Sequence, residues 1–187
     1  MVYLLGFLIV LAFSFSAIWA IINIYNLLVR LVQNVKNGWA QIDVQLKRRH
    51  DLIPNLVETA KGYMGHERQT LEAVVKARQQ AVDASGLKDK QQAENILTDT
   101  LKSLFAVVES YPNLKADKLF TELQEELSST ENRISIARES YNNQIAKLNT
   151  TIQMFPANII AGKFGFASSE YLAIEGADRQ TPSVKFQ

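Results

Sequence analysis

The chain opens with an unbroken apolar stretch. No charged side chain occurs from Val2 to Ile22, and thirteen of these residues are Leu, Ile, Val or Phe. A helix of this length extends about 31 Å, which matches a hydrocarbon core of about 30 Å. At very roughly 0.4 kcal/mol for each large apolar residue, insertion into the bilayer is favoured by about 5 kcal/mol. The pattern predicts a transmembrane anchor over residues 1–29.

A cleaved signal peptide is the alternative interpretation of this stretch. However, it lacks a basic region before the apolar run, the run is too long, and Ser14-Phe15-Ser16 matches a cleavage site poorly. We therefore expect the segment to be retained. No Lys or Arg precedes it, whereas Arg30 and Lys36 follow it. The positive-inside rule then predicts a single-pass protein whose bulk faces the cytoplasm.

Apolar residues recur at three- and four-residue steps directly after the anchor. They predict one amphipathic helical stretch that continues the transmembrane helix outward. Pro54 interrupts it, because proline removes a backbone donor and clashes with the preceding turn. Either the helix kinks there, or a new helix begins with Asp51 as its N-cap. The positions that follow this period are Leu31, Val35, Trp39, Ile42, Leu46, Ile53, Leu56, Ala60, Tyr63, Leu71 and Val74, with Arg78 in the same phase.

Two more helices follow. The pattern stops at Ala84-Ser85-Gly86-Leu87, where Gly86 can adopt a left-handed conformation, and a second helix is predicted from about Asp89 to Ser110. The third helix has the strongest periodicity of the chain and extends over about 40 residues, or roughly 60 Å. Its apolar seam consists of Ala116, Phe120, Leu123, Leu127, Thr130, Ile134, Ala137, Tyr141, Ile145, Leu148, Ile152 and Phe155.

This seam is longer than the helix before it. The second helix reaches only about 33 Å, so either the first long helix or a second copy of the protein must cover the remainder. Two consecutive steps of four around Tyr141 form a stutter, which locally unwinds a coiled-coil seam. The residues predicted to carry helix packing or oligomerisation are Phe120, Leu127, Ile134, Tyr141, Asn142, Leu148 and Asn149.

The asparagines beside the seam have two interpretations. Asparagine is a poor helix former, so its presence costs helix stability. Either these side chains are solvated on an exposed face, or Asn142 and Asn149, seven residues apart, line a packed contact and fix its register.

Composition and motifs give no catalytic site. The 20 Lys and Arg residues nearly balance 19 Asp and Glu residues, so we expect no nucleic-acid partner. The absence of cysteine excludes a disulfide framework and a thiolate metal site. His66-Glu67 is not followed by a second histidine at zinc-protease spacing, and neither a nucleophile elbow nor a phosphate-binding loop is present. We expect no enzyme activity, no cofactor and no metal.

One basic and aromatic segment is a candidate binding site. Lys47-Arg48-Arg49 would stand nearly 40 Å beyond the anchor on a straight helix, too far for lipid headgroups unless the chain folds back at Pro54. Pairing with Asp43, Asp51 or another subunit is the simpler interpretation. The alternative is a binding module for an anionic ligand or lipid headgroup, formed by Trp39, Arg48, Arg49, His50, Asn55, Tyr63, His66 and Glu67.

The chain contains three long motifs: LVRLVQNVKNGWAQIDVQLKRRHDLIPNLVETAKGYMGHE, YPNLKADKLFTELQEELSSTENRISIARESYN and FPANIIAGKFGF. They closely resemble the LemA family of bacterial membrane proteins. The sequence departs from the family pattern at Val32-Gln33, where an arginine is common, at Gly38, where alanine is usual, and at Leu119, where asparagine is usual. These departures affect local contacts only.

The resemblance implies an all-α protein with an N-terminal transmembrane helix and an antiparallel bundle of long helices. We expect an anchor over residues 1–29, a LemA-like bundle over 30–166 and a flexible tail over 167–187, frayed beyond about Glu175. The implied function is a scaffold or adaptor of the bacterial cytoplasmic (inner) membrane. It would contact lipid through the anchor and either form a homo-oligomer or hold a membrane-associated protein partner.

Overall fold

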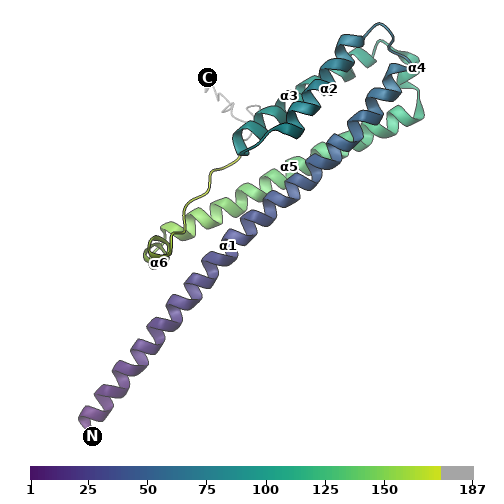
Figure 1. The fold of residues 1–187 in the computed structure, drawn as a ribbon. Helices are drawn as coiled ribbons and strands as arrows, with labels where there is room; N and C mark the ends of the chain where they lie inside the picture. Colours follow the sequence, from purple (N-terminus) through teal and green to yellow (C-terminus); the bar gives the residue numbers. More distant parts are fainter. Residues whose placement is uncertain (174–187) are drawn as a thin grey trace, which may run out of the picture.

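The computed structural model describes residues 1–173, and this part of the chain is helical, without a strand. Six helices follow one another in the chain (Figure 1). This confirms the predicted all-α fold with a long apolar helix first. The helices are α1 (Val2–Lys61), α2 (Arg68–Asp83), α3 (Leu87–Val108), α4 (Pro112–Lys115), α5 (Lys118–Gln153) and α6 (Ala157–Phe164).

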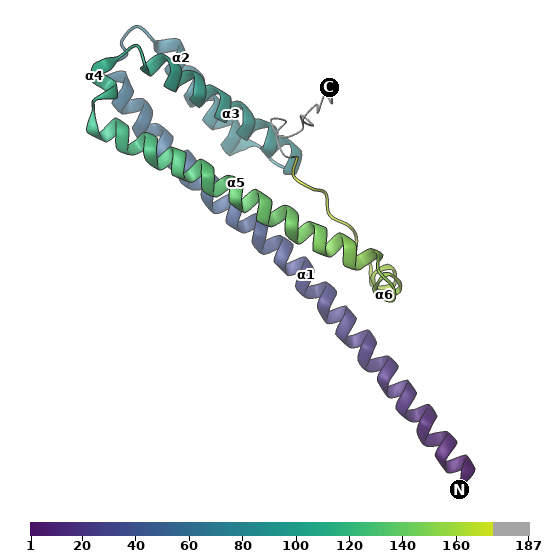
Figure 2. The ribbon, with the colours of Figure 1, turned by 180° about the vertical axis from the view of Figure 1, so that it is seen from behind.

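α1 is a single helix of 60 residues, about 90 Å long. Its first part projects beyond the other helices, and every side chain from Tyr3 to Asn23 is exposed (Figure 2). It is the one described helix long and apolar enough to cross a membrane. Burial begins at Ile24 and Leu28, so the predicted boundary at residue 29 lies inside a continuous helix.

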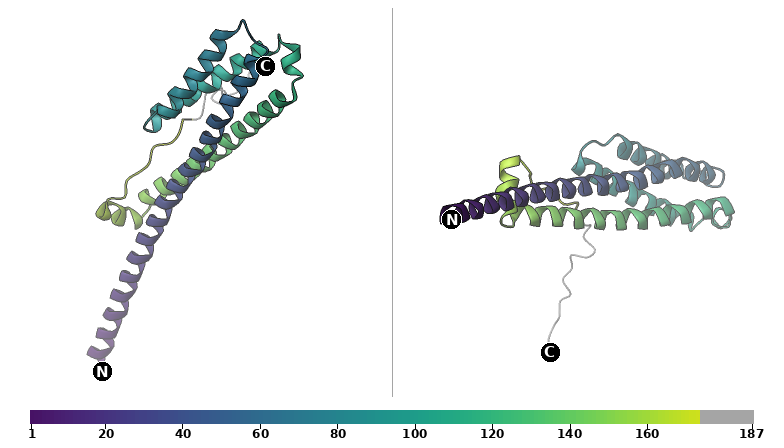
Figure 3. Two further views of the ribbon diagram at one scale, coloured as in Figure 1. Left: turned by 45° about the vertical axis from the view of Figure 1, so that its right-hand side comes forward. Right: turned by 90° about the horizontal axis from the view of Figure 1, so that it is seen from below.

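α1 also answers the question of what covers the long seam. α5 runs antiparallel to α1 along the bundle, and the views of Figure 3 show the two side by side. α1 contributes Val35, Ile42 and Leu46 to a shared core. Self-association is therefore not required to bury the seam. On α5 this core contains Ile134, Tyr141, Ile145 and Leu148.

The hairpin of α2 and α3 covers the end of the bundle farthest from the anchor. It packs Leu71, Val74, Leu97 and Leu104 into a second core with α1 and α5, whose residues include Ile53, Leu56, Phe120, Leu123 and Leu127. Gly86, at the turn between α2 and α3, has a φ of 86°, a value that favours glycine. The turn predicted at this residue is confirmed.

Of the two alternatives for Pro54, the structure excludes a new helix that begins at Asp51. α1 continues through Pro54 and ends only at Lys61. α2 starts at Arg68, after a turn that contains Gly62 and Gly65. Proline is tolerated because another group satisfies the carbonyl that it leaves unpaired, as shown below.

The third predicted helix is shorter than expected at both ends. Asp117 is the N-cap of α5, and its carboxylate accepts a hydrogen bond from the backbone N–H of Phe120 at 2.8 Å. Ala116 therefore lies before the helix. Phe155 lies after it and is 79% exposed, so neither end of the predicted seam belongs to the core.

The tail predicted from residue 167 is partly packed. Residues 167–173, here called the strap, extend along the bundle, and Leu172 is buried in the core shared by α1 and α5. The structure corrects the start of the tail. The rest of the predicted tail, including the fraying beyond Glu175, lies outside the described residues.

Candidate functional site

The eight residues of the predicted binding module lie in three separate neighbourhoods. All but three are on α1, where 22 residues between Trp39 and Lys61 correspond to about 33 Å. A single pocket cannot include both ends of such a segment. Trp39 lies toward the membrane end, Arg48, Arg49, His50 and Asn55 lie further along α1, and Tyr63, His66 and Glu67 lie at the far tip.

Arg49 and His50 belong to a buried ionic network. The Arg49 guanidinium is 1% exposed and pairs with the carboxylates of Glu94 on α3 and Glu131 on α5. It also donates to Thr98 Oγ1 at 3.0 Å. The Nε2 atom of His50 lies 2.9 Å from the second carboxylate oxygen of Glu94. The network therefore links α1 to α3 and α5 at one level of the bundle.

The charge of this network does not favour an anionic ligand. Burial alone would raise the pKa of the Glu94 carboxyl, but the hydrogen bond from His50 and the positive charge of Arg49 together lower it below its ordinary value. Glu94 is thus ionised at neutral pH. Two carboxylates already surround one guanidinium, so Arg49 offers no uncompensated positive charge.

Arg48, the residue before Arg49 on α1, is on the surface. Its side chain is 48% exposed and pairs with Glu126 of α5, which is 39% exposed. Lys90 of α3 pairs with Asp43 of α1. Arg48 and Arg49 of the basic cluster are therefore paired within the chain, as the simpler interpretation expected, although their partners are neither Asp43 nor Asp51.

The aromatic and tip residues have structural contacts of their own. The ring of Trp39 lies 5.8 Å from that of Tyr141, between centroids, and 5.6 Å from Lys90 Nζ. At the tip, the Tyr63 hydroxyl donates to Asp117 at 2.9 Å, and this hydrogen bond raises the pKa of Tyr63. The Tyr111 hydroxyl donates to Glu67 at 3.3 Å, while both Asn55 and His66 are exposed.

Arg78 compensates for the proline inside α1. Pro54 has no N–H, so the carbonyl of His50 loses its partner four residues later in the helix. The Nε–H of Arg78 donates to this carbonyl at 2.7 Å. The bond gives the His50 carbonyl a donor that it would otherwise lack, and it attaches α2 to α1 at His50.

Three amide side chains hold the strap by its backbone. Asn142 donates to the carbonyl of Leu172 and accepts from its N–H, both at 3.0 Å. Asn149 makes the same pair of bonds with Ser169, at 3.0 and 2.9 Å, and Gln91 of α3 bonds to both backbone groups of Ala173. The asparagines therefore line a packed contact and fix its register, and the contact lies within one chain.

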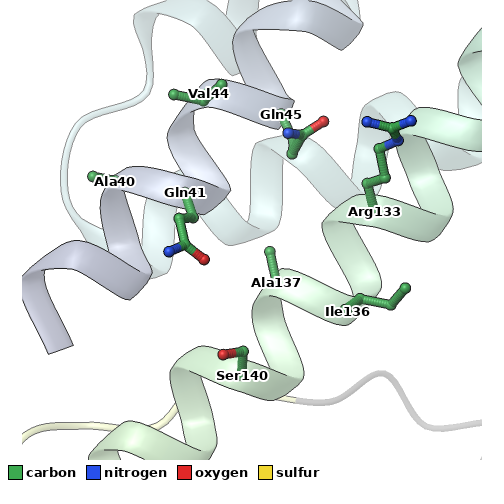
Figure 4. Close-up of a pocket in the computed structure, with 8 residues that line it drawn as sticks. All are labelled: Ala40, Gln41, Val44, Gln45, Arg133, Ile136, Ala137 and Ser140. Atoms are coloured by element: carbon green, nitrogen blue, oxygen red, sulfur yellow. The ribbon is translucent and has the colours of Figure 1, made fainter. Parts of the chain in front are cut away.

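An open groove of about 550 Å³ lies between α1 and α5 on the surface of the bundle (Figure 4). Val44 on α1 and Ile136 on α5 line it and are 63% and 59% exposed. The Oε1 atom of Gln45, also in its wall, is buried and has no hydrogen-bond partner among the described residues. The groove thus presents exposed apolar side chains at its surface.

Sequence reasoning missed the partners of these groups, although a signal existed for some of them. Glu94 lies in phase with Leu97 and Leu101 on the apolar side of α3, and Arg49 lies in phase with Leu46 and Ile53 on α1. A charged residue at such a core position predicts a buried partner of opposite charge. Arg78 gave the same signal, because it lies in phase with Leu71 and Val74 on α2, whereas no comparable signal pointed to Gln91.

Comparison with known proteins identifies the family. The family model described as LemA family matches residues 38–186. Protein LemA of Metamycoplasma hominis is 26% identical over 164 residues, which cover 86% of this chain and 75% of that protein. Magnetosome protein MamQ 2 of Paramagnetospirillum magneticum is 24% identical, and Magnetosome protein MamQ of Magnetospirillum gryphiswaldense is 23% identical.

The match with each MamQ protein covers 79% of this chain and 64% of the relative. The chain therefore spans less than two thirds of the length of these two relatives. The family match, in contrast, covers most of the chain and all of α2 to α6. Together with its exposed apolar first helix, this match makes the chain a membrane-associated member of the LemA family.

Proposed function

We propose that this protein is a non-enzymatic, membrane-anchored helical scaffold that holds a protein partner at a fixed distance from the bilayer. The observation that carries the proposal is the continuity of α1, which leaves the apolar segment and enters the bundle core without a linker. From Asn23 to Lys61 this helix extends about 57 Å. A partner bound along it would be held at a defined height above the membrane.

The groove between α1 and α5 is the surface that best fits a partner. A groove between two antiparallel helices accepts the side-chain ridge of a third helix. Val44 and Ile136 would supply apolar contact. We therefore infer that the partner presents a helix, from a membrane-associated protein or a second copy of this chain.

The names of the relatives are compatible with this role. The name Protein LemA gives a family, and the name magnetosome protein MamQ gives a cellular structure. Neither name states a reaction. A homo-oligomer would not use the α5 seam as its interface, because α1 already buries that seam.

The orientation of the bundle is a separate part of the proposal. Arg30 and Lys36 follow the apolar segment and no basic residue precedes it, which favours a bundle on the cytoplasmic side of the inner membrane. A C-terminal reporter that is active only in the cytoplasm should be active in the fusion protein. A reporter active only after export should remain silent, and the reverse pattern would overturn the orientation.

Site-specific photocrosslinking in intact cells tests the scaffold itself. A photoreactive residue at Val44 probes the groove, and one at Ile96 of α3, which is 45% exposed, is the matched control outside it. We expect a discrete adduct from position 44 only. Coexpression of two differently tagged copies distinguishes self-association from another protein. Equal labelling at both positions, or none, together with a strict monomer in nanodiscs, would refute the proposal.

A further inference from the structure

A second exposed apolar surface lies where α5 ends and α6 begins. Met154 and Phe155, in the turn between these helices, are 58% and 79% exposed. Ile159 and Phe164 of α6 are 61% and 52% exposed. Because α5 runs back toward the anchor, this turn is at the end of the bundle nearest the projecting part of α1 (Figure 1). Large apolar side chains therefore gather at the membrane-proximal end of the bundle.

The contacts of α6 define its height relative to the bilayer. Ile160 and Ala161, on its inner face, pack against Leu28 of α1. The ring of Tyr25 meets the rings of Phe164 and Phe166 at centroid distances of 5.0 and 5.6 Å. α6 is thus fixed to the segment of α1 just beyond the apolar stretch.

That segment falls in the headgroup layer when the apolar stretch fills the hydrocarbon core. The stretch ends at Ile22, and Leu28 lies six residues beyond it, or about 9 Å. The polar layer of a bilayer is roughly 5 to 8 Å thick on each side of the core. The contacts of α6 with Tyr25 and Leu28 therefore bring this helix to the depth of the headgroups or just above them.

The direction of α6 suits the same location. α1 is seen lengthwise in Figure 1, whereas α6 is seen nearly along its axis, and the right-hand view of Figure 3 shows α6 running across the direction of α1. A helix crosswise to a membrane-spanning helix lies along the membrane plane. This is the orientation of interfacial amphipathic helices, which bury an apolar face at the boundary of headgroups and acyl chains.

Charge at this end of the molecule also favours a lipid surface. Residues 1–42 and 140–169 contain four cations and no Asp or Glu. The whole chain has a formal charge of +1, so the remainder carries −3. Basic residues near a membrane are attracted to anionic lipid headgroups within about one Debye length. The four cations are Arg30, Lys36, Lys147 and Lys163.

We propose that α6 and the turn before it form a second membrane contact. In this arrangement Phe155, Ile159 and Phe164 enter the interfacial layer, and Lys163 lies among the lipid phosphates. The occupant of this surface is the lipid bilayer itself, because the surface is continuous with the apolar segment of α1. The inference depends only on insertion of α1 and goes beyond the scaffold role.

Single-cysteine labelling of the full chain in nanodiscs tests this proposal, since the chain has no native cysteine. An environment-sensitive fluorophore is attached in the variant Ile159→Cys. The matched control is Leu119→Cys, an apolar residue with nearly the same exposure at the start of α5, outside the groove and far from the anchor. A third variant, Leu11→Cys, reports insertion of α1. Quenching is compared between nitroxide-labelled lipids and aqueous iodide.

We expect lipid quenching and protection from iodide at positions 11 and 159, and the opposite at 119. Lipid quenching at 11 combined with iodide quenching at 159 equal to that at 119 would overturn the inference while leaving the anchor intact. Protection at 159 from both quenchers would assign the surface to a second copy or another protein instead. It would therefore overturn the inference as well.

Neutral and anionic nanodiscs separate the apolar and charged contributions. Lys163→Gln in the Ile159→Cys background should reduce lipid quenching in discs with phosphatidylglycerol and leave it unchanged in discs of phosphatidylcholine alone. Phe155→Ser should reduce it in both. If neither substitution changes the quenching while the circular dichroism spectrum stays that of the parent, the assigned contacts are wrong.

Discussion

The buried network around Arg49 should respond strongly to the loss of one charge. Glu94→Gln keeps the shape of the side chain and removes the carboxylate that pairs with Arg49 and accepts from His50. Removal of one partner from a buried ion pair typically costs about 3–5 kcal/mol, because the other charge stays buried without compensation. Arg49 retains Glu131 and Thr98, so we expect a loss near the lower end, about 3 kcal/mol.

The pair formed by Arg48, the residue before Arg49, offers a matched control. Glu126→Gln removes the partner of Arg48, but the two side chains of that pair are 48% and 39% exposed. Exposed ion pairs typically contribute about 0.2–1 kcal/mol. Because about 1 kcal/mol shifts the midpoint of a protein of this size by 2–4 °C, Glu94→Gln should lower it by about 6–12 °C. Glu126→Gln should lower it by less than about 4 °C.

Thermal unfolding in mild detergent, followed by far-ultraviolet circular dichroism, measures both shifts. The pH dependence supplies a second readout. Burial raises the pKa of Glu94, but His50 and Arg49 together lower it by more than burial raises it. The folded protein therefore releases this proton more readily than the unfolded chain. The stabilisation is therefore present above the ordinary glutamate pKa and is lost as the pH falls through the folded pKa.

The difference between the native protein and Glu94→Gln should accordingly shrink in acid. Equal, small shifts for Glu94→Gln and Glu126→Gln at neutral pH would refute the conclusion that burial makes the Arg49 network the stronger of the two. A difference that stays constant down to strongly acidic pH would refute the assignment of its ionised form to the folded state.

Three further outcomes are expected. Arg78→Met should lower the free energy of unfolding in urea by about 1–3 kcal/mol, because the buried His50 carbonyl loses its donor. The loss should be smaller in a Pro54→Ala background, where a helical N–H is restored. Equal losses in the two backgrounds would contradict the compensation. Replacing Asn142 and Asn149 by alanine should speed hydrogen exchange of the Leu172 and Ser169 amides at least about fivefold, because each amide loses a hydrogen bond of about 1 kcal/mol; unchanged exchange rates would contradict the role of these bonds. Gly38→Leu should lower the free energy of unfolding by about 1–3 kcal/mol, whereas Gly38→Ala, whose Cβ would meet a ring on α5 at 3.3 Å, should need only a small shift.

Local periodicity predicted most of the helical core. The three- and four-residue steps identified Ile42, Leu46 and Ile53 of α1, and all three are buried in the structure. Of the twelve predicted seam positions, eight are buried. Such patterns are reliable because a helix that buries one face must repeat apolar residues every 3.6 positions. The anchor could be recognised for a related reason, since only an uncharged segment of this length can fill the hydrocarbon core.

Pairing between distant segments could not be predicted in the same way. The α5 seam shows that something must cover it, but the sequence leaves open whether α1 or a second copy does so. The strap belongs to the segment predicted to be a flexible tail over residues 167–187. Its order comes from side-chain amides that recognise backbone groups, and such contacts leave almost no trace in the sequence of the bound segment.

The candidate site was predicted less well than the fold for a physical reason. Basic residues on a helix look alike in sequence whether they are solvated or buried, and their role depends on groups from other helices. Arg48 and Arg49 are adjacent, yet one is 48% exposed by its side chain and the other 1%. Phase with the apolar stripe distinguishes them, since Arg49 lies three residues after buried Leu46 and four before buried Ile53.

The two membrane contacts together would explain how a single-span protein can act as a scaffold. One transmembrane helix alone leaves tilt and rotation to be set by its packing and interfacial anchors. A crosswise α6 resting on the headgroups would remove rotation about the axis of α1, because α6 is packed against Tyr25 and Leu28. The groove containing Val44 would then have a fixed height and also face one direction along the membrane. A partner bound there would be oriented as well as retained, which a flexible linker between anchor and bundle could not achieve.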